Sequence, residues 1–102
     1  MNRHEIIELL KANKARLVEH GVKHISLFGS RARDEYYSKS DVDLCIELNL
    51  DQGAPGFARI QQIQEIKEYL SKLLRNNVDI VVEPVFGENL RTEIERDRKH
   101  AF

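Results

Sequence analysis

The sequence contains one cysteine, two prolines, no tryptophan and no long apolar run. A single cysteine cannot form an intrachain disulfide, which fits a reducing cytoplasm. No apolar segment approaches the ~20 residues of a membrane span. The polar start, Met1 to Glu5, leads into an amphipathic segment and not into a signal peptide. We therefore expect a cytoplasmic protein that does not contact a membrane.

The charges show no excess of either sign. Sixteen Lys and Arg stand against seventeen Asp and Glu, for a net charge of −1. Because the chain has no excess of positive charge, it is not expected to bind nucleic acid directly. The 102 residues fit one compact domain, 1–102, large enough for a core but too small for a second lobe.

The hydrophobic periodicity predicts helices and strands in alternation. Helices are expected at 3–20, 31–37, 57–74 and 89–99, and strands at 22–28, 41–48 and 78–82. Two glycines and a proline make 49–56 a loop. This order predicts a small α/β (α+β) domain, with a mixed sheet and helices packed on one face.

The strand predicted at 41–48 alternates strictly between apolar and polar residues. Residues two apart share a face of a strand, so its even-numbered residues are all apolar and face the core. Asp41, Asp43, Cys45 and Glu47 face the open side. Two neighbouring carboxylates repel each other unless a cation lies between them, and such hard oxygen ligands suit Mg²⁺ or Mn²⁺.

The turn before this strand supplies a complementary site. Gly29 permits tight backbone geometry and close approach of a phosphate. Ser30 is predicted to cap the following helix, whose first amides form an anion site. A metal site beside a phosphate site describes a site for a nucleoside triphosphate.

Asp79 is the third candidate carboxylate, at the start of the strand 78–82. It is predicted to lie beside Asp41 and Asp43, to bind the catalytic metal and to act as base toward an attacking hydroxyl. The alternative is a strand-end residue that faces water. Glu83 shares its face but lies roughly 13 Å along the strand at ~3.3 Å per residue, so Asp79 is preferred.

Other polar residues near the turn have two possible roles. Arg31 and Arg33 are either phosphate ligands or members of structural ion pairs, since a guanidinium suits both. Tyr36 and Tyr37 could stack on a base, but packing is the preferred interpretation. Cys45 is interpreted as an unreactive packed residue.

The pattern of Gly29-Ser30, ten residues and Asp41-x-Asp43 resembles the signature of the polymerase-β-like nucleotidyltransferase superfamily. The fuller runs 29–33 and 40–44 are similar to its minimal nucleotidyltransferase branch, and the resemblance covers essentially the whole chain. It implies that the open face of the sheet is the active site. One departure is Asp34, where the family pattern has Gly; it adds negative charge near the phosphate site.

The resemblance implies an enzyme that transfers AMP from ATP to a hydroxyl. Asp41 and Asp43 would hold two Mg²⁺ ions (or Mn²⁺), Gly29, Ser30 and the helix amides would bind phosphates, and Asp79 would help activate the acceptor. Minimal nucleotidyltransferases are typically encoded beside a HEPN-domain ribonuclease toxin, and some modify a tyrosine of that toxin with AMP. The resemblance therefore implies an antitoxin that adenylylates its partner.

Two alternatives stay open. The chain could be an antitoxin that neutralises its partner by binding alone, which Asp34 favours slightly. It could also be a small-molecule nucleotidyltransferase that resembles the aminoglycoside-modifying enzymes, although the absence of a second lobe counts against this. The sequence does not decide the acceptor, the preferred nucleotide or whether the chain forms a homo-oligomer.

Overall fold

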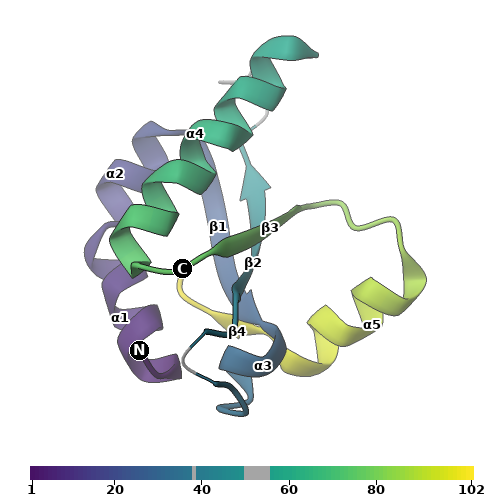
Figure 1. Ribbon diagram of the computed structural model, residues 1–102. Helices are drawn as coiled ribbons and strands as arrows, with labels where there is room; N and C mark the ends of the chain where they lie inside the picture. The colour runs from purple at the N-terminus through teal and green to yellow at the C-terminus, as the bar shows by residue number, and fades with distance from the viewer. Residues whose placement is uncertain (38, 50–55) are drawn as a thin grey trace.

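A computed structural model describes residues 1–37, 39–49 and 56–102 of the chain. Its elements are, in order, α1 (Arg3–Ala12), α2 (Lys14–Glu19), β1 (Val22–Phe28), α3 (Gly29–Ala32), β2 (Val42–Leu48), α4 (Phe57–Leu74), β3 (Val78–Val82), α5 (Glu88–Asp97) and β4 (Lys99–His100). The strands form one sheet in the order β3-β2-β1-β4. Helices α1, α2 and α4 lie on one side of this sheet and α5 on the other (Figure 1).

The sheet is mixed, as predicted. β1 runs antiparallel to β2 and to β4, whereas β2 and β3 are parallel. Parallel neighbours need a long crossover connection, and α4 supplies it between β2 and β3. This crossover sets the start of β3 beside the start of β2, and both starts carry aspartates.

The main core lies between the sheet and helices α1, α2 and α4. Its fully buried members include Ile6 and Leu10 of α1, Leu17 of α2, Ile25 and Leu27 of β1, Leu44 and Ile46 of β2, and Ile66 and Leu70 of α4. Burying one such side chain contributes about 1.5–3 kcal/mol. The apolar face predicted for β2 therefore packs against these helices.

A smaller cluster lies on the opposite face of the sheet. Phe28, Cys45 and Ile94 are buried there, with Val81, Val85 and Leu90 packed against them. Ile94 and Leu90 belong to α5, so this helix covers part of the face that the sequence pattern left open. The rest of that face carries the aspartates of β2 and β3.

The first predicted helix is two helices. α1 ends at Ala12 and α2 begins at Lys14, because Asn13 lies at the junction with non-helical backbone angles. The Asn13 side-chain amide donates to the Leu9 carbonyl at 2.8 Å and accepts from the Tyr69 hydroxyl at 3.0 Å. Side chains of this kind compete with helical hydrogen bonds, so a continuous apolar stripe does not guarantee one helix.

Two further predictions at element ends are wrong. α3 spans only Gly29–Ala32 and does not continue to 37, since Asp34 adopts a left-handed backbone angle of φ 56°. The last helix ends at Asp97, and the two residues of β4 then pair with β1. Strand β4 is too short to show periodicity. Of the loop predicted at 49–56, residues 50–55 lie outside the described residues.

Among the described residues, no helix is both long enough and apolar enough to cross a bilayer.

Candidate active site

Gly29 lies at the end of β1, directly against β2. Its φ of +76° is a conformation that L side chains rarely adopt. Phe28 is the ladder partner of Asp43, and a Cβ atom at position 29 would lie 2.3 Å from Asp43 Oδ2. A side chain at position 29 would therefore be strained and would also collide with the carboxylate.

Asp43 and Asp79 are Cα partners in the parallel ladder between β2 and β3. Neighbouring strands lie ~4.8 Å apart, so the two side chains project side by side from the same face. Asp41 is exposed immediately before β2. The structure thus brings Asp79 beside the pair, at the place that its position in the third strand predicted.

The carboxylates create a strongly negative local field. Burial and the charges of Asp79, Glu93 and Asp41 together raise the pKa of Asp43 to about 6, while the charge of Arg33 opposes them. Like charges at this separation disfavour simultaneous ionisation. A divalent cation would relieve the same repulsion.

No three His, Cys, Asp or Glu side chains in the described part of the chain are already gathered as a metal site. The donor set nevertheless fits a hard cation, because it consists of carboxylate oxygens beside a glycine that leaves room for another group. Mg²⁺ is commonly held by one or two carboxylates plus substrate phosphates. A preassembled cage is therefore not needed for that ion.

The prediction that Ser30 caps a helix is wrong. Helix α3 begins at Gly29, its N-cap position is Phe28, and no side chain caps it. Ser30 lies inside the first turn, where its carbonyl accepts from the Glu35 amide at 2.9 Å. With four residues, α3 also offers only a small dipole. A phosphate role for Ser30 stays a prediction that depends on the turn itself.

Arg31 has a structural role: it binds backbone carbonyls. Its side chain is 2% exposed. Its two terminal nitrogens donate to the backbone carbonyls of Met1 at 2.8 Å and Ser40 at 2.9 Å, and its guanidinium lies 4.1 Å from the centre of the Tyr36 ring. This residue ties the connector between α3 and β2 to the N-terminus. The prediction that Arg31 binds phosphate is therefore not supported.

Arg33 points toward α5 and is more accessible. Its Nη1 donates to Asp97 Oδ2 at 2.5 Å, and its Nε to Glu35 at 3.3 Å. These hydrogen bonds raise the pKa of Arg33 above its usual value. Asp97 is buried and also accepts two hydrogen bonds from Arg96. Arg33 thus joins α3 to α5, and a contact with phosphate stays a prediction for it.

Asp34 carries its charge away from the aspartate pair. Its carboxylate pairs with Arg3 at 3.6 Å and accepts from the Arg3 backbone amide at 3.2 Å. Its φ of 56° explains the family preference for Gly at this position, and Asp is among the few other residues that adopt such angles. The added negative charge is therefore paired at the start of α1.

Cys45 and Glu83 belong to a separate polar cluster farther along the sheet. Cys45 is buried, as predicted, and burial raises the pKa of its thiol to about 11. Its thiol donates to Glu83 at 3.3 Å, and Arg98 donates to both residues. Glu83 is therefore occupied by Arg98 and does not compete with Asp79.

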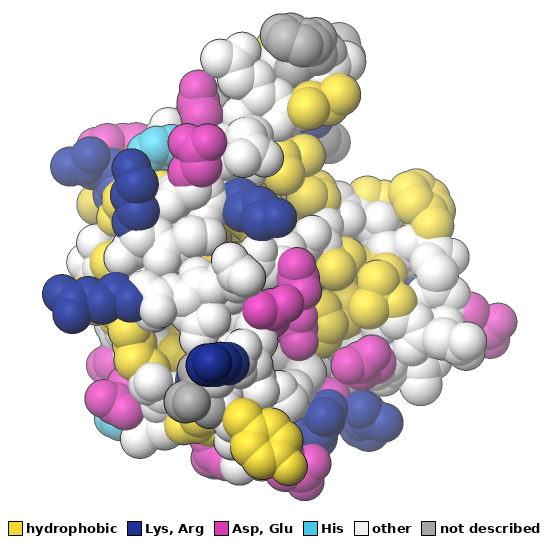
Figure 2. Space-filling model, in the orientation of Figure 1, with side chains coloured by type: hydrophobic (Ala, Val, Ile, Leu, Met, Phe, Trp, Pro, Cys, Tyr) yellow, Lys and Arg dark blue, Asp and Glu magenta, His cyan; other side chains and the backbone are white. Residues whose placement is uncertain are grey.

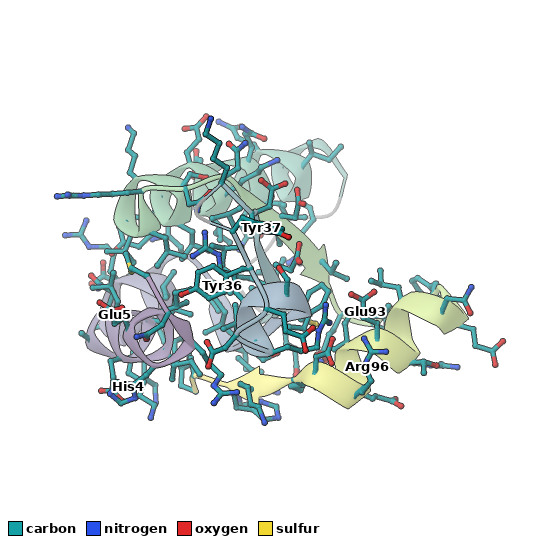
Figure 3. All side chains as sticks on the ribbon, turned by 60° about the horizontal axis from the view of Figure 1, so that its bottom comes forward. His4, Glu5, Tyr36, Tyr37, Glu93 and Arg96 are labelled. Atoms are coloured by element: carbon teal, nitrogen blue, oxygen red, sulfur yellow. The ribbon has the colours of Figure 1, made fainter. Side chains whose placement is uncertain are left out.

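The two tyrosines of the connector between α3 and β2 differ in environment (Figure 3). Tyr36 packs on Arg31 and lines a cavity of about 710 Å³ on the helical side of the molecule. Tyr37 is 86% exposed, so the predicted packing applies to Tyr36 and not to Tyr37.

The aspartates lie on an open surface. Asp41 and Asp79 are both exposed. Two cavities among the described residues do not include them: one is that beside Tyr36, and the other, of about 340 Å³, lies around Cys45 and Arg98. Figure 2 shows acidic side chains beside a hydrophobic patch in the region between the sheet and α5. A bound nucleotide would leave much of its surface accessible to a second protein.

Glu93 is the residue of this region that the sequence analysis missed. It is half-buried on α5, and its charge acts on Asp43. Its position three residues after the apolar Leu90 was the available signal. That signal was weak because charged residues surround it throughout 88–98.

We expect Asp43→Asn to stabilise the metal-free protein. In the unfolded chain an Asp has a pKa of ~3.9, whereas folding raises the pKa of Asp43 to about 6. The folded state therefore binds more protons between these values, and the free energy of unfolding falls as pH rises through pH 4 to 6. The variant should lose this dependence and gain about 1–2 kcal/mol at pH 7.5, with solvent screening considered.

Urea unfolding in EDTA at pH 4.5 and 7.5 measures this effect. The exposed Glu95, replaced by Gln, provides the control. A loss of stability in Asp43→Asn at pH 7.5 would instead make Asp43 a structural residue.

Comparison with known proteins identifies the family of the chain. The model of the nucleotidyltransferase domain family matches residues 6–101. A Methanocaldococcus jannaschii chain with the provisional name of protein adenylyltransferase is 35% identical over 95 residues, which cover 91% of each chain. The protein adenylyltransferase MntA of Thermococcus cleftensis is 31% identical over 94 residues, which cover 91% of this chain and 89% of the relative.

Solved structures share the fold. One, described provisionally as a minimal nucleotidyltransferase, has a TM-score of 0.74 at 26% identity and covers 97% of this chain and 95% of its own. A chain from the structure of a tri-AMPylated Shewanella oneidensis HEPN toxin in complex with MNT antitoxin has a TM-score of 0.53 at 18% identity. That match covers 89% of this chain and 70% of the other. At this identity the similarity concerns the fold alone.

Proposed function

Because this chain belongs to the nucleotidyltransferase domain family, we propose that it transfers AMP from ATP to a hydroxyl of a partner protein, as an antitoxin that modifies a HEPN-domain toxin. The enzyme class, nucleotidyltransferase, follows from the family and from its relatives. The observation that carries the proposal is the register that pairs Asp43 with Asp79 while Gly29 lies against Asp43.

Asp41, Asp43 and Asp79 would hold the divalent ions, Mg²⁺ or Mn²⁺. Such ions neutralise the charge that develops on the attacking and leaving oxygens of an in-line displacement. Burial and the neighbouring charges of Asp79, Glu93 and Asp41 raise the pKa of Asp43 to about 6, and a cation would relieve the repulsion among these charges. The apo site is thus electrostatically prepared for a cation.

The turn at Gly29 and Ser30 would receive the phosphates of ATP. Gly29 presents backbone and no side chain beside the aspartates, so a phosphate oxygen can come close to the metal ligands. Arg33 is the nearest candidate cation, but it is shared with Asp97. Its contribution to phosphate binding would be limited to the part of the guanidinium that Asp97 leaves accessible.

The partner protein would complete the site. Asp41 and Asp79 are exposed, and neither lines a described cavity that could hold the acceptor. The relatives named as protein adenylyltransferases and the complex of a modified HEPN toxin with MNT antitoxin support a protein acceptor for this chain. A tyrosine is the proposed acceptor residue.

Neutralisation by binding alone is the second candidate. Asp34 favoured this candidate because it adds negative charge near the phosphate site. Its ion pair with Arg3 offsets that charge and weakens the support. The aspartate cluster also favours chemistry, because these carboxylates repel each other and a divalent cation would relieve that repulsion.

We expect ATP with Mg²⁺ or Mn²⁺ to raise the melting temperature of the chain. A ligand that binds only the folded state at 100 times its Kd adds about 2.7 kcal/mol to the free energy of unfolding. For a domain of this size, each kcal/mol corresponds to about 4–8 °C. Thermal melts with metal, with ATP and with both measure the effect.

ATP in EDTA serves as the control, since nucleotide binding through metal ions requires both components. The absence of any shift with millimolar ATP and metal would contradict a working nucleotide site.

A further inference from the structure

Glu93 occupies an inward position of α5. Glu93 lies three residues after Leu90 and four before Asp97, and residues at these spacings share one side of a helix. Ile94 and Asp97 are buried and Leu90 packs against the small cluster. Glu93 therefore lies on the side of α5 that faces the sheet, where Figure 3 also shows it. A charged residue at such a position is unusual unless it is paired or functional.

The two anchors of α5 hold Glu93 over the aspartate end of the sheet. Ile94 packs with Phe28, which is the ladder partner of Asp43. Asp97, one turn later, accepts the hydrogen bond from Arg33. The negative charge of Glu93 is among those that raise the pKa of Asp43.

Glu93 forms no salt bridge with any residue that the structure describes. The nearby cations Arg33 and Arg96 both donate to Asp97 instead. Its carboxylate is thus half-buried, close to the aspartates and free to accept a hydrogen bond. Asp41, Asp43 and Asp79 would commit their oxygens to metal ions, and a metal-bound oxygen is a poor proton acceptor.

We propose that Glu93 accepts the proton of the acceptor hydroxyl, an inference that rests on the proposed transfer of AMP. The hydroxyl proton moves to the Glu93 carboxylate while the hydroxyl oxygen forms a bond to the α-phosphorus of ATP. The bond between the α-phosphorus and the bridging oxygen breaks, and its electron pair leaves with pyrophosphate. Glu93 later releases the proton to water. Asp79 then serves as a metal ligand and not as the base.

The test compares Glu93→Gln with Glu95→Gln, which removes an exposed charge from the same helix. The acceptor is the HEPN-domain partner protein, and labelled AMP on it is measured against pH from 5.5 to 9.5. A positioned general base contributes about 10²–10⁴-fold, so Glu93→Gln should lower kcat by that factor near neutral pH. The KM for ATP and the melting shift with ATP and Mg²⁺ should stay as in the unchanged chain.

The pH profile separates a base from a structural residue. Without Glu93, the rate should keep rising toward the ~10 pKa of a tyrosine hydroxyl, whereas the unchanged chain should reach a plateau. The charged groups on which Glu93 acts are Asp43, which lies next to Asp79 in the ladder, and Arg96 of its own helix. Arg33 also acts on Asp43. The Glu95→Gln variant retains all of them and should keep the original profile.

Each outcome of this test has one interpretation. Equal kcat in the two variants would overturn the role of Glu93 and leave AMP transfer intact. Loss of the ATP-induced melting shift in Glu93→Gln would also overturn it, since Glu93 would then support binding and not proton transfer. Glu93→Asp keeps a shorter carboxylate and should retain part of the rate, which provides an answer if the Gln variant folds poorly. No AMP transfer by the unchanged chain would refute the proposed function itself.

Discussion

Replacing Asp41 and Asp43 together by Ala should reduce AMP transfer to the partner protein by about 10³-fold or more. The two carboxylates are proposed to hold the ions that neutralise charge in the transition state, and such electrostatic stabilisation is usually the largest contribution to catalysis. Asp79→Ala should have a similar effect, because Asp79 lies beside Asp43 in the ladder. Intact-mass spectrometry of the partner after incubation with ATP and Mg²⁺ measures the transfer.

The fold of these variants should survive, because removal of repelling charges relieves strain that the metal-free protein carries. Circular dichroism and co-purification with the partner provide the controls. A double variant that binds the partner but no longer protects cells would identify chemistry as the mechanism of protection. Full protection by the same variant would refute that mechanism and favour neutralisation by binding.

Arg31→Met should destabilise the protein by about 2–4 kcal/mol. The side chain is 2% exposed and donates to the backbone carbonyls of Met1 and Ser40. Each buried acceptor left without a donor costs about 1–3 kcal/mol, and the lost packing on Tyr36 adds to this. Urea unfolding monitored by circular dichroism gives the change in free energy.

Arg16→Met is the matched control, because Arg16 is exposed and forms only a surface ion pair with Glu19. Such substitutions usually change stability by less than about 0.5 kcal/mol. If Arg31→Met were as stable as Arg16→Met but failed to bind ATP, the phosphate role that the structure argues against would be restored.

Three of the strands, β1, β2 and β3, and the aspartate pair were predictable because they depend on local sequence: apolar runs for β1 and β3, and strict alternation for β2. The strand at 22–28 has the bounds of β1, that at 78–82 those of β3, and β2 begins one residue later than expected. The placement of Asp79 also followed, because its position at the start of a strand fixes its face and its end of the sheet. These signals require no knowledge of side-chain partners.

The predictions were wrong where contacts of a side chain determine the backbone conformation or the position of a residue. Asn13 interrupts an apolar stripe by hydrogen bonding to Leu9, and Asp34 ends α3 with a left-handed angle. The role of Arg31 depends on carbonyls 30 residues before it and nine residues after it in the chain. Glu93 reaches the site only through the packing of α5, which no pattern around it reveals. Tertiary contacts of this kind override local preference.

The contact between Gly29 and Asp43 limits how this site could change over evolutionary time. Any side chain at position 29 meets the carboxylate and would force it to turn away, because the ladder holds the Asp43 backbone opposite Phe28. A single substitution at either residue would thus remove the site, whereas no single substitution could move it. New specificity for an acceptor would have to arise from elements free of this constraint, such as the exposed part of the connector around Tyr37 and the outer side of α5.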